Sequence, residues 1–126
     1  MMMPTSRRLM DVPRRAEGWL PWLCLLLCSV AMPSLTAATA TWNGLGANDL
    51  WSTSANWQGG VAPVAGDDLV FAGATRLTPS NDFAANTSFK SITFASGASA
   101  FTVTGVGITL AGNITNSSAN TQTITV

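Results

Sequence analysis

Four aspartates are the only carboxylates that follow the first apolar run of the chain: Asp49, Asp67, Asp68 and Asp82. The sequence has no histidine, which excludes Ser-His-Asp and Cys-His catalysis and proton transfer by imidazole. A glycosidase needs two carboxyl groups about 5–9.5 Å apart, whereas adjacent residues such as Asp67 and Asp68 point to opposite faces of a strand. We therefore expect no catalytic residues, no enzymatic activity and no cofactor.

A metal site is the next chemistry that these acids suggest. Asp67 and Asp68 could begin a calcium site with Asp82, but Ca²⁺ takes six to eight oxygen ligands and no known loop spacing is present. Aspartate is also a routine turn residue. We predict that Gly66 and Asp67 form a structural turn, in which Gly66 supplies an unusual φ and the Asp67 carboxylate accepts backbone N–H bonds. No metal is expected.

Three tryptophans, Trp42, Trp51 and Trp57, support two interpretations. In the first, the indoles pack together and cover the open end of a β-structure, because large rings bury much area with few rotatable bonds. In the second, one or more of them lie on the surface as ligand-binding residues that stack on sugar rings, which makes the domain a carbohydrate-binding module with a surface polysaccharide as partner. We favour the first, because a folded domain usually buries its aromatic residues.

The N-terminal segment, residues 1–40, has the pattern of a secretory signal. Arginines precede an apolar stretch over residues 19–32, and Ala38-Thr39-Ala40 offers an A-x-A cleavage site before Thr41. Cleavage one or two residues earlier also fits. The alternative is an uncleaved membrane anchor, which would be the chain's only contact with a membrane. The apolar stretch is shorter than the roughly 20 residues of a membrane span.

The remaining part, residues 41–126, is predicted to be one secreted or cell-surface domain. Both cysteines, Cys24 and Cys28, lie before it, so we expect a domain without disulfides. Only two basic residues, Arg76 and Lys90, follow the signal. The domain therefore has no basic patch, and nucleic acid is not an expected partner.

Alternating apolar and polar residues over 90–126 predict short strands with one buried face. Glycine, asparagine and serine interrupt the runs and predict tight corners. Earlier in the chain, residues 68–71 and 75–77 are predicted strands, and residues 79–82 are a predicted turn. No run after the signal is long and periodic enough for a helix.

A spacing of about 22 residues separates Ile92 from Ile114, and Phe101 from Ile124. This spacing is within the range of solenoid repeats. The predicted fold class is therefore all-β: a short-strand, β-helix-like β-solenoid with a Trp-rich N-terminal cap, preceded by a helical signal segment. The alternative is an antiparallel β-sandwich, which also has regularly spaced strands.

The sequence ends at Val126 within a predicted strand, after about one and a half repeats. Solenoids usually need three or more repeats, and an open strand edge invites pairing with another chain. We therefore expect further repeats, or self-association, through the open C-terminal edge. On this expectation the sequence is the start of a longer protein, a truncated product or a subunit that needs a partner.

One set of residues resembles a known family. The pattern W…NW…P…GD…F, followed by a Ser-Ile-Thr-Phe strand, resembles the opening of bacterial secreted proteins built from autotransporter-associated β-strand repeats. Its residues here are Trp51, Asn56-Trp57, Pro63, Gly66-Asp67, Val70-Phe71 and Ser91-Ile92-Thr93-Phe94. The resemblance implies a signal peptide, long β-solenoid repeats and a non-enzymatic, adhesin-like or stalk-like role outside the cell. The family has no common catalytic residues.

Overall fold

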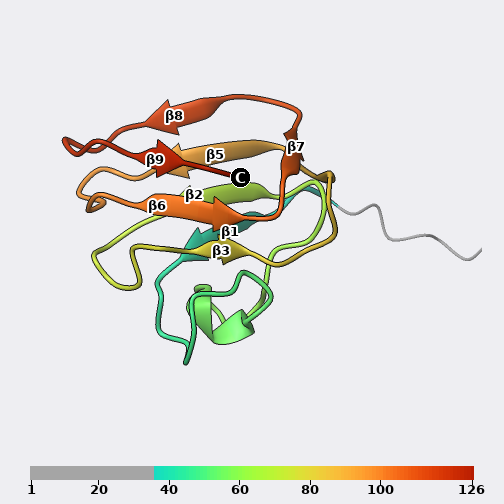
Figure 1. Cartoon of the computed structure of the whole chain (residues 1–126), viewed down its shortest axis with the longest axis horizontal. Coiled ribbons are helices and arrows are strands. Elements are labelled where there is room, and N and C mark those ends of the chain that lie inside the picture. Colours follow the sequence, from blue (N-terminus) through green and yellow to red (C-terminus); the bar gives the residue numbers. More distant parts are fainter. Residues whose placement is uncertain (1–35) are drawn as a thin grey trace, which may run out of the picture. The chain divides into compact units, whose positions relative to one another are not determined.

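The computed structural model describes residues 36–126 (Figure 1). The predicted signal segment lies outside the described residues except for its last five positions. The described chain is all-β, and its one helical turn is the short 3₁₀ segment η1 (Ser54–Asn56). The strands are β1 (Thr39–Trp42), β2 (Asp68–Phe71), β3 (Ser80–Asn81), β4 (Thr87–Phe89), β5 (Ser91–Phe94), β6 (Thr102–Gly105), β7 (Ile108–Leu110), β8 (Ile114–Asn116) and β9 (Thr123–Ile124).

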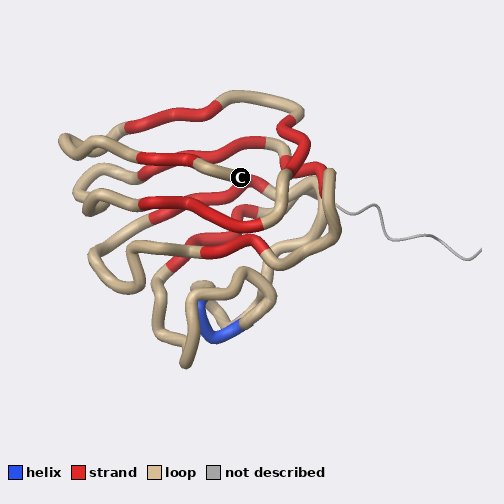
Figure 2. The backbone as a smooth tube through the Cα atoms, in the orientation of Figure 1, coloured by secondary structure: helices blue, strands red, loops and turns tan. Residues whose placement is uncertain are grey.

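Three small sheets share these strands, and the chain visits the sheets in turn. Their strand orders are β1-β2-β5-β8, β3-β6-β9 and β4-β7. All pairings between named strands of the described residues are parallel. Figure 2 shows the strands stacked in successive passes of the chain. An antiparallel sandwich, the alternative that the sequence left open, is therefore wrong for this part of the chain.

Register in the largest sheet follows the apolar residues. Leu69 pairs with Ile92, and Ile92 pairs with Ile114, which confirms the predicted relation between the last two. The other predicted relation is wrong by two residues, because Ile124 pairs with Val103 and not with Phe101. The Phe101 amide N–H instead donates to Gln122 Oε1 at 2.8 Å, a polar contact that the apolar pattern did not indicate.

In β1, β2, β5 and β6, buried residues alternate with more exposed ones along each strand. The buried residues of these strands belong to the core. Its aromatic column includes Phe71 and Phe94, whose rings stack with centroids 5.5 Å apart. Phe101 joins them, with its ring centroid 5.7 Å from that of Phe71. Burial then declines toward the C-terminus, since β8 is exposed along its whole length.

The predicted strand over residues 68–71 coincides with β2. The prediction fails over the next segment, where residues 75–77 form no strand and the predicted turn at 79–82 contains β3. Asn81 explains the difference. Its side chain is buried, donates to the Val106 carbonyl oxygen at 2.6 Å and accepts from the Phe83 N–H at 3.0 Å. A residue typical of turns therefore serves a strand that pairs with β6.

Strand β1 begins at Thr39, so the predicted domain boundary before Thr41 falls in the middle of a strand. Ala40, the last residue of the predicted signal segment, is buried against the core. The cleavage position itself stays a prediction. Within residues 36–126, no helix is long and apolar enough to cross a membrane.

Candidate functional site

The three tryptophans gather in one cluster beside β1. Their exposed fractions are 0% for Trp42 and Trp51 and 1% for Trp57. Trp57 lies between the other two, with ring centroids 5.2 Å from Trp42 and 6.3 Å from Trp51, and both pairs are edge-on. Phe71 packs against all three rings. No indole face is therefore open to stack on a sugar in this structure.

Two of the three indole N–H groups donate hydrogen bonds to backbone carbonyl oxygens. Trp57 Nε1 donates to the Trp51 carbonyl oxygen at 2.7 Å, and Trp42 Nε1 donates to the Arg76 carbonyl oxygen at 3.2 Å. Trp51 Nε1 is buried without a hydrogen-bond partner among the described residues. The cluster is thus held by packing and internal hydrogen bonds, as expected for aromatic residues that shield a core.

Asn56 organises the loop that carries Trp51 and Trp57. It is fully buried, and its amide oxygen accepts from the Gly46 N–H at 2.8 Å. Its Nδ2 donates to the carbonyl oxygens of Asn48 and Leu50 at 2.8 and 3.0 Å. One side chain therefore satisfies three backbone groups of a loop that has little regular secondary structure of its own.

The same loop occupies the outer edge of β1. The Asn43 N–H donates to the Asn56 carbonyl oxygen, and the Gln58 N–H donates to the Thr41 carbonyl oxygen, each at 2.8 Å. Trp42 and Trp57 form an antiparallel bridge between these contacts. Because these groups are paired, the loop covers this edge of the sheet near Trp42 and blocks another strand there.

Gly66 and Asp67 form a turn just before β2. Gly66 has φ of 95°, a value that favours glycine. Asp67 is 5% exposed, and its two carboxylate oxygens accept from the N–H groups of Val64 and Ala38, each at 2.9 Å. The carboxylate therefore ties the turn to the start of β1, across 29 positions of the sequence.

The other acids serve separate local contacts. Asp68 accepts from Lys90 Nζ at 2.9 Å and from the Ser91 hydroxyl. Ser91 first, and Lys90 second, hold the pKa of Asp68 below its ordinary value. Asp49 pairs with Arg76 at 3.2 Å, and Asp82 binds Ser52. In the described part of the chain, no three metal-ligating side chains of His, Cys, Asp or Glu come together.

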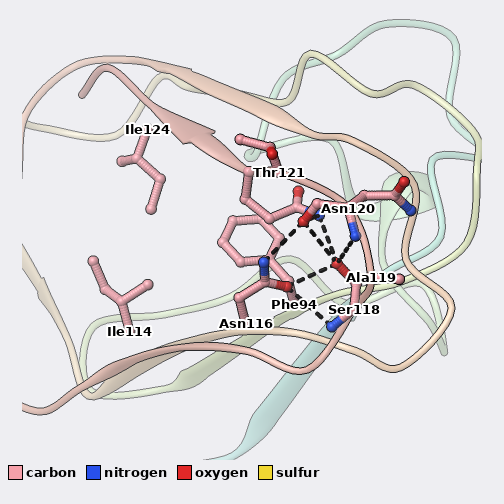
Figure 3. Close-up of a pocket in the computed structure, with 9 residues that line it drawn as sticks. Phe94, Ile114, Asn116, Ser118, Ala119, Asn120, Thr121 and Ile124 are labelled. Carbon is pink, nitrogen blue, oxygen red and sulfur yellow. Dashed lines mark hydrogen bonds between the residues drawn. The ribbon is translucent and has the colours of Figure 1, made fainter.

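A groove lies at the opposite end of the stack, where β8 and β9 are the last strands, and the sequence did not predict it. Its volume is about 430 Å³. Phe94 forms part of its wall, and Ile114 and Ile124 point toward one another across it (Figure 3). Ile114 is 54% exposed, although its partner Ile92 in the neighbouring strand is fully buried. The groove is thus lined in part by apolar side chains that the last strands leave exposed.

Polar side chains close one side of this groove. The corner over residues 116–122 is held by side-chain hydrogen bonds, drawn in part in Figure 3. Asn120 Nδ2 donates to the Ala98 carbonyl oxygen at 2.8 Å, and Gln122 Nε2 donates to the Ser99 carbonyl oxygen at 3.0 Å. These bonds tie the last corner to the preceding one.

Comparison of the chain with models of protein families, with curated proteins and with solved structures found no match. Function is therefore argued from the geometry above.

Proposed function

We propose that this chain is a non-enzymatic scaffold of an exported protein, built as a β-solenoid and presented on the cell surface or outside the cell. One observation carries this proposal. Each pass of the chain adds a parallel strand to the sheet of β2, β5 and β8, and the paired residues Leu69, Ile92 and Ile114 are 23 and 22 positions apart. Repeats of this length are typical of solenoids, in which each repeat contacts only its neighbours.

The end of the stack formed by β1 and the loop around Asn56, here called the leading end, has the features of a solenoid cap. It therefore supports the proposed β-solenoid. Trp42, Trp51 and Trp57 cover the first layer of the core, and the loop around Asn56 pairs with the outer edge of β1. A solenoid needs such a cap to keep its first layer away from water and from other strands.

The end of the stack formed by β8 and β9, here called the trailing end, supports the proposal that a further layer of strands packs on it. The last layer leaves Ile114 half-exposed, and the outer edge of β8 has no paired strand among the described residues. We propose that this end receives further repeats or a second copy of the chain. Either would bury Ile114 and Ile124. Further repeats would extend the ladder of parallel strands, whereas a second copy would close it.

Export and an adhesin-like or stalk-like role follow from the signal pattern of residues 1–40 and from the resemblance to secreted proteins with autotransporter-associated β-strand repeats. The described acids make structural contacts: Asp67 with the Ala38 N–H, Asp68 with Lys90 and Asp49 with Arg76. The alternative, a carbohydrate-binding module that uses Trp42, Trp51 and Trp57, is disfavoured by the burial of all three indoles.

The test uses the full chain, expressed in a bacterium with its own N-terminus and recovered from outside the cytoplasm. We expect blue-shifted tryptophan emission that resists acrylamide quenching and does not respond to chitin or cellulose oligosaccharides. The variant Val61→Trp is the matched control, because Val61 is 69% exposed and an indole there must be quenched. A wild-type emission that shifts with either sugar supports the binding module, and retention in the cytoplasm contradicts export.

A further inference from the structure

We propose that the export segment is removed by cleavage of the peptide bond between Ala37 and Ala38, so that the exported chain begins at Ala38. This inference rests on the proposed export. The A-x-A pattern alone placed the cut three residues later, after Ala40. The folded domain argues against that position, because residues 38–40 already take part in its structure.

Strand β1 needs the residues that a cut after Ala40 would remove. Thr39 pairs with Asp68, and Ala40 pairs with Leu69. The Ala38 carbonyl oxygen accepts from the Asp68 N–H at 2.8 Å. Ala40 is 8% exposed and belongs to the core. A chain that began at Thr41 would keep only half of β1 and would leave the start of β2 without its neighbour.

Asp67 supplies the second reason, because its carboxylate contacts the backbone nitrogen of Ala38. Its carboxylate is nearly buried, and one oxygen accepts from the Ala38 nitrogen at 2.9 Å. If Ala38 is the first residue, that nitrogen is an ammonium group, and the contact becomes a charge-assisted pair. If the chain begins at Thr39 or later, a buried carboxylate oxygen loses its donor, which is costly.

The cleavage itself is a hydrolysis that a host peptidase catalyses. The C–N bond between Ala37 and Ala38 breaks, and water supplies the hydroxyl group of the new Ala37 carboxyl group, which releases its proton to solvent and becomes a carboxylate. The Ala38 nitrogen takes the remaining proton and a second one from solvent to become the ammonium. Residues 36–39 are exposed, and the bond lies ahead of β1. Ala37 is the small residue directly before the bond, whereas Leu35 departs from the A-x-A pattern.

The experiment is N-terminal sequencing, together with the intact mass, of the product that the full chain yields outside the cytoplasm. We expect Ala38 as the first residue. Any other first residue in an exported product, Thr41 above all, overturns this inference and leaves the proposed export standing. A full-length chain that stays in the cytoplasm overturns both.

Two variants separate the candidate cuts, and both are scored by mass, which does not depend on folding. Ala37→Leu places a bulky residue beside the proposed bond and should abolish the product that begins at Ala38. Ala40→Val places a bulky residue beside the competing bond and should leave that product unchanged. The reverse pattern overturns the proposal. Asp67→Asn should keep the cut and lower the melting temperature of the exported chain, and an unchanged melting temperature overturns the role given to Asp67.

Discussion

Gly105 is the last residue of β6 and pairs with Asn81 of β3, where a side chain on Gly105 does not fit. Its φ is 105°, and a Cβ at this position would overlap the backbone oxygen and nitrogen of Asn81. Gly107, two residues later, has open space around it and no left-handed φ. Two neighbouring glycines therefore have different roles: the first permits close approach of two backbones, and the second only forms part of a corner.

We expect Gly105→Ala to lower the free energy of unfolding by about 2 kcal/mol or more, because it adds backbone strain and a steric overlap. Gly107→Ala is the matched control and should change that free energy by less than about 0.5 kcal/mol. Urea denaturation of both variants measures the difference. Equal effects of the two substitutions would contradict the close approach of β3 and β6.

Asp68 should make stability depend on acid pH. Its folded-state pKa is lowered, so its contribution is present at neutral pH and is lost as the pH falls through that folded pKa, below the ordinary value of about 3.9. We expect the free energy of unfolding of Asp68→Asn to fall less steeply than that of the wild type as the pH decreases through this range. Since the Ser91 hydrogen bond is the larger cause, Ser91→Ala should flatten this fall more than Lys90→Gln. Urea denaturation at a series of pH values measures the slopes, and an unchanged slope in Asp68→Asn would refute the prediction.

At the scale of the element, the loop between β1 and β2 is ordered by polar side chains at buried positions. Asn56 holds its first half, and Asp67 holds its end against β1. Trp51 and Trp57 supply apolar contacts of the loop with the core. A loop of this length with little regular structure stays ordered because its backbone groups find partners inside the protein.

We expect Asn56→Ala to destabilise the protein by about 2–4 kcal/mol, because it leaves three backbone groups of the loop without their partner. Asn113→Ala is the control, since the Asn113 side chain is exposed, and it should be nearly neutral. Thermal unfolding monitored by tryptophan emission reports directly on the loop. A neutral Asn56→Ala would show that the loop does not depend on this amide.

At the scale of the whole domain, its two ends differ. The edge of β1 is paired with the loop around Asn56, whereas Ile114 of β8 is 54% exposed. Figure 1 shows β1 and β8 at opposite ends of the stack of strands. The loop therefore obstructs addition of a second copy's trailing strand at the leading end, and we do not expect an open-ended filament of identical copies. When two copies meet through their trailing ends, neither leaves a trailing end for a third copy, so the assembly stops at a dimer.

We therefore expect the exported chain to form a dimer that dissociates on dilution. Ile114→Lys should shift it to a monomer, because the charge would be buried between the two trailing ends. Leu45→Lys is the control, since Leu45 is 73% exposed in the loop at the capped end. Light scattering coupled to gel filtration measures the mass. A wild-type monomer at every concentration would contradict association through Ile114.

The strand over residues 68–71 and the relation between Ile92 and Ile114 were predictable from the sequence, because the period-two pattern and the repeat length are local properties of the chain. The Gly66-Asp67 turn has the same local origin. The sequence did not predict β3, whose polar residues are typical of a turn, or the two-residue shift that pairs Ile124 with Val103. Both depend on hydrogen bonds to residues more than 20 positions away.

By itself, the sequence determined that this chain forms short strands and corners, with tryptophans available to cover a core and no histidine for catalysis. Only the tertiary structure decided that all three indoles are buried, that the trailing layer is open and that residues 38–40 belong to the folded domain. The physical reason is that burial and strand pairing are set by neighbours in space. In a parallel arrangement those neighbours come from another pass of the chain, which no local pattern specifies.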